Sequence, residues 1–176
     1  MTAVAREAPG EEPLTLCLAA DPFSLAEANI NPLTGLSTDY LNHFNEAIML
    51  LEMLPSMPEC REDLADWRPL GYHEHFTRSQ LKQRELAIAA YDLAAPSVRR
   101  RFDALCEAMK SAVLAAQAVL AADLAPGDAA HVAVETTAEL KRLVALANAV
   151  IHGQEFSGPA ASIQESQAAV DAILQP

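Results

Sequence analysis

The sequence predicts an all-α protein: an antiparallel four-helix bundle with short accessory helices and a C-terminal amphipathic helix. Alanine carries much of the apolar half of the 176 residues and aromatic residues are few, which favours close helix packing over a β core. Apolar residues recur at steps of three and four in several long segments. Proline, glycine and capping residues separate these segments, and neither an alternating strand pattern nor an internal repeat occurs.

The first long helix is predicted over residues 38–54, with Ser37 or Thr38 as its N-cap and Pro55 as its stop. Four of its apolar residues form one stripe: Leu41, Phe44, Ile48 and Leu51. Neighbouring apolar residues widen that stripe until little of the surface is polar. Other helices must therefore bury it.

Shorter elements are predicted between the first and second long helices. A capping box at Ser56 predicts a short helix to about Trp67, and residues 72–76 are interpreted as a polar, aromatic connector. A further capping box at Thr77 begins the second long helix, which is expected to run to about Ala94.

The third and fourth long helices have the most regular patterns. In the third, seven residues alternate steps of four and three: Val98, Phe102, Leu105, Met109, Ala112, Ala116 and Val119. The fourth repeats this rhythm in Ala133, Thr137, Leu140, Val144, Ala147 and Ile151. His152 in the last turn and Gly153 just after it form a C-terminal stop signal.

Four regions are expected along the chain: residues 1–36, 37–153, 154–161 and 162–176. The first is a mostly disordered N-terminal segment with a short helix at a Ser24 capping box. The second is the four-helix bundle domain and the third is a linker. The fourth is an amphipathic helix with a narrow apolar stripe formed by Ile163, Val170, Ile173 and Leu174. A lone helix of about a dozen residues is marginal in water, so it should fold on its own bundle or on a partner.

Charge and cysteine content restrict the class of protein. The net charge of −12 argues against nucleic acid and against anionic membrane surfaces as partners. The three cysteines are far apart and form no metal-binding or disulfide pattern. The sequence shows no signal peptide, and its longest low-polarity run, 112–122, is too short to span a bilayer. We therefore expect a cytoplasmic protein.

The C-terminal segment 166–174 carries the clearest functional pattern. It resembles the short peptides by which the flagellar motor switch protein FliM and the chemotaxis phosphatase CheZ bind the response regulator CheY. Six positions fill that pattern: Ser166, Gln167, Val170, Asp171, Ile173 and Leu174. The resemblance implies that a receiver domain of a bacterial two-component system takes this helix in a groove, with Asp171 facing a basic residue. The alternative is a tail helix packed on its own bundle or on a dimer mate.

The same resemblance bears on catalysis. Chemotaxis phosphatases use an acid and an amide on one helical face, in Asp-x-x-x-Gln or Glu-x-x-Asn spacing. Here Glu-x-x-Asn is absent, and the only Asp-x-x-x-Gln joins Asp171 to Gln175 inside the tail. No phosphate loop, nucleophile elbow or zinc-protease motif occurs either, so no cofactor is expected. The sequence therefore favours a non-catalytic adaptor.

Two histidine pairs suggest an alternative metal-binding function. His43 and Glu46 are three residues apart on the first long helix, and His131 and Glu135 are four apart on the fourth. A ferritin-like di-iron site requires Glu-x-x-His on two helices, and no such spacing occurs in this sequence. A metal ion shared by these two pairs stays an alternative hypothesis.

A third group of residues suggests phosphotransfer. His73, Glu74 and Thr77 have His-Glu-x-x-Thr spacing, which resembles the phospho-acceptor box of dimerising histidine kinases. Arg78 stands where that family has proline, and no ATP-binding domain follows. The resemblance implies His73 as phosphoryl acceptor. A further reading is a structural homodimer that buries the apolar surface of the first and third long helices.

Overall fold

A computed structural model describes residues 22–122 and 124–154 of the chain, and this part is all-α. Its helices are α2 (Pro22–Glu27), the 3₁₀ helix η1 (Thr38–Leu41), α3 (Asn42–Met53), α4 (Cys60–Asp66), α5 (Tyr72–Arg78), α6 (Arg84–Leu93), α7 (Pro96–Leu120) and α8 (Pro126–Ile151). The only β-type pairing among the described residues is a single bridge between Ile30 and Ser37. The predicted fold class is confirmed, whereas the antiparallel four-helix bundle stays a prediction.

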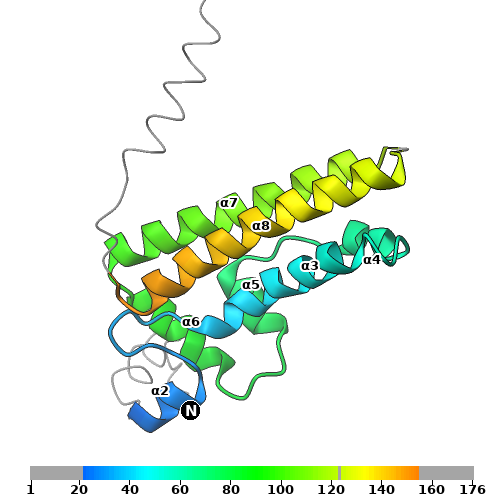
Figure 1. The fold of residues 1–176 in the computed structure, drawn as a ribbon. Helices are drawn as coiled ribbons and strands as arrows, with labels where there is room; N and C mark the ends of the chain where they lie inside the picture. Colours follow the sequence, from blue (N-terminus) through cyan, green and yellow to red (C-terminus); the bar gives the residue numbers. More distant parts are fainter. Residues whose placement is uncertain (1–21, 123, 155–176) are drawn as a thin grey trace, which may run out of the picture.

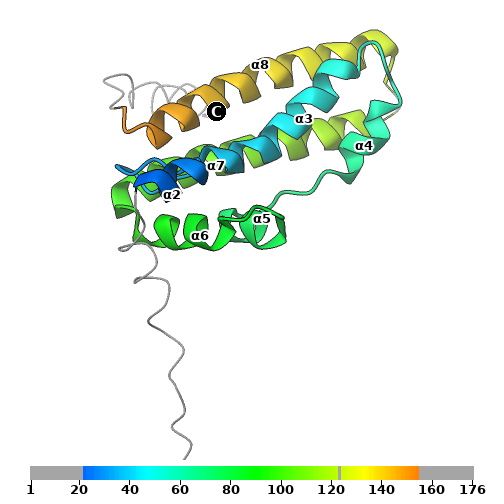
Figure 2. The same cartoon turned by 90° about the horizontal axis from the view of Figure 1, so that it is seen from below.

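The two longest helices, α7 and α8, lie side by side and are joined by a short turn (Figure 1). α3 packs against α8, and α4 packs against α3 and α7. α5 and α6 pack on each other, on the opposite side of α3 from α8 (Figure 2). Among the described residues, no helix is both long and apolar enough to cross a membrane.

Aromatic side chains fill the centre of this arrangement. Tyr40, Phe44, Phe76 and Phe102 are fully buried. The Tyr40 ring has its centroid 5.1 Å from that of Tyr72 and 6.0 Å from that of Phe102, so α5 and α7 meet η1 at one point. Each fully buried side chain of this size stabilises the fold by about 1.5–3 kcal/mol. These aromatic residues come from η1, α3, α5 and α7, so the four elements share one core.

Part of the predicted N-terminal segment 1–36 is packed in the structure, since it contains the short helix α2 and buried residues after it. α2 begins at Pro22, before the Ser24 capping box. After it, Ile30 and Leu36 are buried in the core cluster. Thr34 donates a hydrogen bond from its Oγ1 to the Ile151 carbonyl at 2.6 Å, which ties this segment to the end of α8. Residues 1–21 lie outside the described residues.

The first predicted helix is confirmed, with a modified start. Its first turn is the 3₁₀ helix η1, capped by Ser37, whose Oγ accepts from the Asp39 N–H at 3.3 Å. All four stripe residues are buried. The Ser56 capping box is not used: Ser56 donates to the Met53 carbonyl instead, and α4 begins at Cys60 without a side-chain cap.

The predicted second long helix is wrong, because the chain forms two shorter helices. The expected connector 72–76 lies within α5, where Tyr72 and Phe76, four residues apart, are buried against the core. Ser79 ends α5, and its Oγ donates to the Phe76 carbonyl at 2.8 Å. Burial of two aromatic rings outweighed the capping signal at Thr77, which is exposed inside α5.

The third and fourth predicted helices are confirmed as α7 and α8, with one shift of register. The buried residues of α7 are Phe102, Cys106, Met109, Val113, Ala116 and Leu120. The predicted seam named Leu105, Ala112 and Val119 one position too early, and Val119 is exposed. Both seams fit the four-three rhythm, so only the neighbouring helices decide between them.

Candidate functional site

The predicted docking residues lie outside the described part of the chain: Ser166, Gln167, Val170, Asp171, Ile173 and Leu174. The structure does show where the chain leaves α8. Gly153 N–H bonds to the Val150 carbonyl and Gln154 N–H to the Ala149 carbonyl, both at 3.0 Å. With φ +68° at Gly153, this is a Schellman motif. The predicted stop is confirmed, so α8 does not continue toward the docking segment.

Within the described residues, His43 is a buried polar side chain that the predicted metal site included. It lies in the first turn of α3 and is buried. Its Nε2 accepts a hydrogen bond from the Leu70 N–H at 3.1 Å. Its ring stacks on Trp67 with centroids 4.6 Å apart, and Trp67 Nε1 donates to the His43 carbonyl at 3.1 Å. These contacts hold the α4–α5 connector on α3.

Two further side chains hold the same connector. Tyr40 donates its hydroxyl hydrogen to the Leu70 carbonyl at 2.7 Å. From α7, the Gln117 amide donates to the carbonyls of Leu64 and Trp67 at 2.6 and 2.8 Å. Residues 67–71 are thus held from α3 and from α7, which positions Trp67 over His43.

The protonation state of His43 follows from this burial. Loss of water lowers its pKa to about 4, and the nearby His75, with ring centroids 6.0 Å apart, acts in the same direction. His75 is half-buried, and burial lowers its pKa as well. His43 is therefore neutral at pH 7, with the lone pair of its Nε2 engaged. A metal ion at that nitrogen would have to displace the Leu70 N–H.

His43 lines one wall of a surface depression of about 470 Å³ between α3, α4 and the connector. Glu46 lines the same depression and is exposed. Other lining residues are Met49, Asp63, Asp66, Arg68 and Arg78. Both signs of charge are present, and Arg78 is paired with Glu74 at 2.6 Å. The three carboxylates of the lining outnumber its two guanidinium groups, so the depression does not favour an anion.

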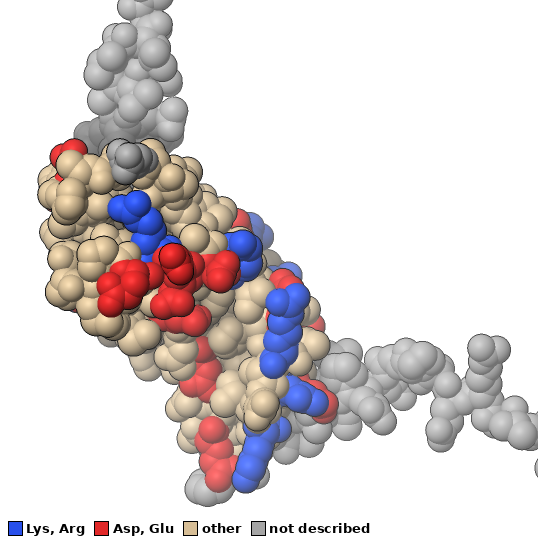
Figure 3. Space-filling model, turned by 90° about the vertical axis from the view of Figure 1, so that its right-hand side faces the viewer, with Lys and Arg blue, Asp and Glu red and all other residues tan. Residues whose placement is uncertain are grey.

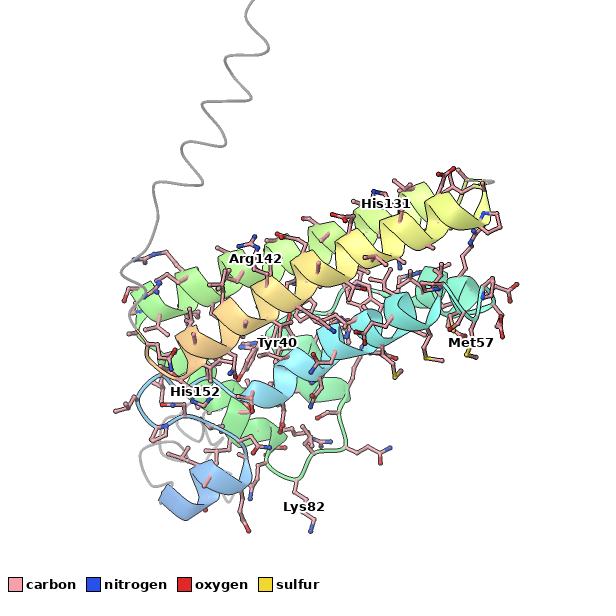
Figure 4. All side chains as sticks on the ribbon, in the orientation of Figure 1. Tyr40, Met57, Lys82, His131, Arg142 and His152 are labelled. Atoms are coloured by element: carbon pink, nitrogen blue, oxygen red, sulfur yellow. The ribbon has the colours of Figure 1, made fainter. Side chains whose placement is uncertain are left out.

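The residues of the predicted metal site are not gathered around one point. His131 and Glu135 are both exposed on α8, and Figure 4 shows His131 on the outer side of that helix. In the part of the chain that the structure describes, no three His, Cys, Asp or Glu side chains form a group that could hold a metal ion. His43 and Glu46 thus have no third ligand there.

The residues of the predicted phosphotransfer site lie on one short helix, α5. His73 is half exposed, and its Nε2 lies 2.9 Å from Asp92 Oδ1 of α6. Glu74 pairs with Arg78 rather than with His73. Thr77 is exposed, one turn after His73. The histidine is accessible, but its described acidic partner is Asp92 and not the expected Glu74.

Acidic side chains dominate the surface around α4. Glu59, Glu62, Asp63 and Asp66 are all exposed there. Figure 3 shows Asp and Glu side chains gathered on this side of the molecule. This face would repel a phosphate backbone.

Sequence reasoning identified His43 but missed what surrounds it. Trp67, the only tryptophan of the chain, was interpreted as the end of a short helix, and Leu70 as part of a break. A lone tryptophan before Arg-Pro-Leu-Gly is a signal for a buried anchor, because such a large ring is seldom left in water. The partners themselves come from distant positions and need the fold.

No protein-family model, curated protein or solved structure matches this chain.

Proposed function

We propose that this chain is a non-catalytic bacterial cytoplasmic adaptor that docks a receiver domain through residues 166–174. The pattern of six residues in that segment carries the proposal. Val170, Ile173 and Leu174 supply apolar anchors at helical spacing, and Asp171 supplies a charge for a basic residue of the partner. The antiparallel four-helix bundle is proposed as the body that presents this segment.

Two features of the described residues support an adaptor over an enzyme. First, the one strongly buried histidine is neutral and hydrogen-bonded to backbone, so it holds structure in place. Second, the described helices share one core, whose residues lie between positions 28 and 151, and α8 ends in a Schellman motif. Eleven residues, which include most of the predicted linker, separate Gln154 from the predicted docking segment at Ser166. This organisation suits a tethered recognition peptide.

Titration of a synthetic peptide of residues 160–176 against receiver domains tests the proposal. Binding should be micromolar and should change on phosphorylation of the receiver. Asp171→Asn and Ile173→Ser should each weaken binding about tenfold, which corresponds to about 1.4 kcal/mol. Gln175→Ala, outside the pattern, is the matched control and should bind as the parent does. No binding at high micromolar concentration to either receiver form would remove the proposal.

Phosphotransfer through His73 is a second candidate function, favoured by its half-exposed ring on a helix shared with Glu74 and Thr77. Incubation with a phosphorylated receiver should then place acid-labile phosphate on the wild-type chain and none on His73→Gln. The metal and homodimer hypotheses remain predictions. Metal analysis of protein purified without a metal column and light scattering, respectively, test them.

A further inference from the structure

A surface groove with both polar and apolar lining lies beside the point where the chain leaves α8, and two exposed leucines stand at its rim. It is formed by α2, the turn 31–35 and the end of α6, and has a volume of about 200 Å³. Its apolar lining includes Leu25, Pro32, Leu33, Leu93, Ala94 and Ala95. We call this surface the Leu33 groove. None of the residues that line it is charged.

The two leucines at its rim are unusually open to water. Leu33 is 86% exposed, more than any other large apolar side chain among the described residues, and Leu93 is 44% exposed. Leu33 is held there by a well-built turn: its N–H donates to Asn31 Oδ1 at 2.9 Å, and the Gly35 N–H donates to the Asn31 carbonyl at 2.8 Å. Gly35 has φ +71° and lies close to Ala90 of α6. The fold therefore fixes an apolar surface in place.

The end of α8 is bound to the same turn. Thr34, next to Leu33, donates to the Ile151 carbonyl. A Cβ placed on Gly153 would lie 3.8 Å from the Thr34 methyl group, so residue 153 is adjacent to the turn. The part of the predicted linker 154–161 that follows Gln154 has seven residues and spans at most about 24 Å when extended. The predicted helix that follows can therefore reach the Leu33 groove.

We propose that residues 162–174 rest on the Leu33 groove in the free protein, and that a partner must displace them. The predicted helix offers an apolar stripe at the spacing a groove between helices accepts: Ile163, Val170, Ile173 and Leu174. Its acidic residues, Glu165 and Asp171, meet no acidic side chain in the lining. A capped helix that is marginal alone gains a surface on which to fold. The binding of residues 162–174 to the Leu33 groove is independent of the proposed function. Only their displacement by a receiver domain rests on that function.

Another segment of the chain could compete for the groove. Leu14, Leu16 and Leu18 also lie outside the described residues and precede α2. They step by two, a spacing that suits an extended strand beside a sheet edge. The groove is built from two helices and a turn, so the helical stripe near the C-terminus fits it better.

Hydrogen exchange on the full chain tests the resting position. Amides of residues 163–174 should exchange at least tenfold more slowly in the wild type than in the free peptide 160–176. Leu33→Glu should abolish that protection, while Met49→Glu, at an exposed site on α3, should preserve it. Thermal melts of both variants should match the wild type, since both positions are exposed.

Three results would overturn the resting position. The tail of the wild type could exchange as fast as the free peptide. Leu33→Glu could instead release protection in residues 14–18, which would make the N-terminal segment the occupant. The variant could also convert a dimer into a monomer in light scattering, which would make a second copy the occupant.

Receiver titration separates this inference from the proposed function. The free peptide and the Leu33→Glu chain should bind a receiver more tightly than the wild-type chain. The ratio of dissociation constants should equal the factor by which the wild-type chain slows amide exchange in residues 163–174. Equal affinity of peptide, variant and wild type would overturn the competition. A protected tail whose peptide binds no receiver would remove the proposed function and leave the resting position intact.

Discussion

At the scale of single residues, His43 shows how one buried polar side chain can organise a connection. Its ring, its Nε2 and its carbonyl oxygen all contact the segment Trp67–Leu70. A buried polar group that is fully hydrogen-bonded stabilises a specific packing, and one that loses a partner is costly. The histidine is therefore a structural determinant of the α4–α5 connector.

The buried state of His43 predicts an acid-sensitive fold. Its folded-state pKa of about 4 lies below the ordinary value of 6.5, so the unfolded state binds more protons between these pH values. Stability should fall as pH decreases through this window, by about 2 kcal/mol between pH 7 and pH 5 from His43 alone. Half-buried His75 should add to the loss. Urea unfolding across this pH range measures the slope.

A variant isolates the His43 contribution. His43→Gln keeps an acceptor for the Leu70 N–H but cannot titrate, so its stability should depend less on pH. His131→Gln, at an exposed position, is the matched control and should keep the wild-type slope. If His43→Gln keeps that slope too, the pH dependence arises elsewhere.

Thr137 offers a second prediction at this scale. Its Oγ1 is buried in α8 without a hydrogen-bond partner among the described residues. Thr137→Val removes the unpaired hydroxyl and keeps the shape, so it should stabilise the fold by about 1 kcal/mol. Thr137→Ala should instead destabilise it by leaving a void, and Thr136→Val at a partly exposed neighbour should change little. Chemical denaturation of the three variants gives the ranking; a destabilised Thr137→Val would contradict it.

At the scale of elements, the ends of helices matter as much as their faces. α7 and α8 both begin at a proline, and α8 ends in a Schellman motif at a glycine. These signals are local, because proline is tolerated at the first helical position and glycine at the left-handed residue after the last. α5 and α6 lack such signals: neither has a side-chain cap, and their boundary is set by which aromatic rings are buried.

Two glycines with positive φ should respond differently to alanine. Gly153→Ala places a side chain at φ +68° in ordinary van der Waals contact, so it should cost about 1 kcal/mol. Gly35→Ala adds a clash, because its Cβ would lie 2.6 Å from the Ala90 carbonyl oxygen. It should cost more than about 2 kcal/mol. Urea titrations that gave equal losses would show that the 31–35 turn moves freely away from α6.

At the scale of the whole molecule, the described helices form one core cluster within residues 28–151. Lys141 of α8 pairs with Glu52 of α3, and Thr34 of the turn 31–35 bonds to the end of α8, so α8 is tied both to α3 and to this turn.

Truncation after Gln154 should separate folding from function. The shortened chain should keep its unfolding free energy within about 1 kcal/mol of the full chain, because it retains every core residue of the described part. It should lose all binding to receiver domains. Thermal melting and receiver titration on the same preparation measure both. A chain that unfolds on truncation would assign the tail a structural role.

The sequence alone indicated the candidate docking segment but not the surroundings of His43 or the Leu33 groove, for a physical reason. The docking segment is a contiguous pattern, so the sequence contains all of it. The environment of His43 joins α3 to a connector about 25 residues later, and the Leu33 groove joins α2 to α6. Such contacts depend on how helices pack, which local periodicity does not specify.

The sequence by itself determined that the chain is all-α, where α3, α7 and α8 lie, and where α8 stops. These follow from apolar spacing and from proline and glycine, whose effects are local. Only the tertiary structure decided that residues 72–93 form two helices, and that Leu120 rather than Val119 completes the α7 seam. In each case the local pattern allowed more than one solution, and the burial of side chains against neighbouring helices selected one.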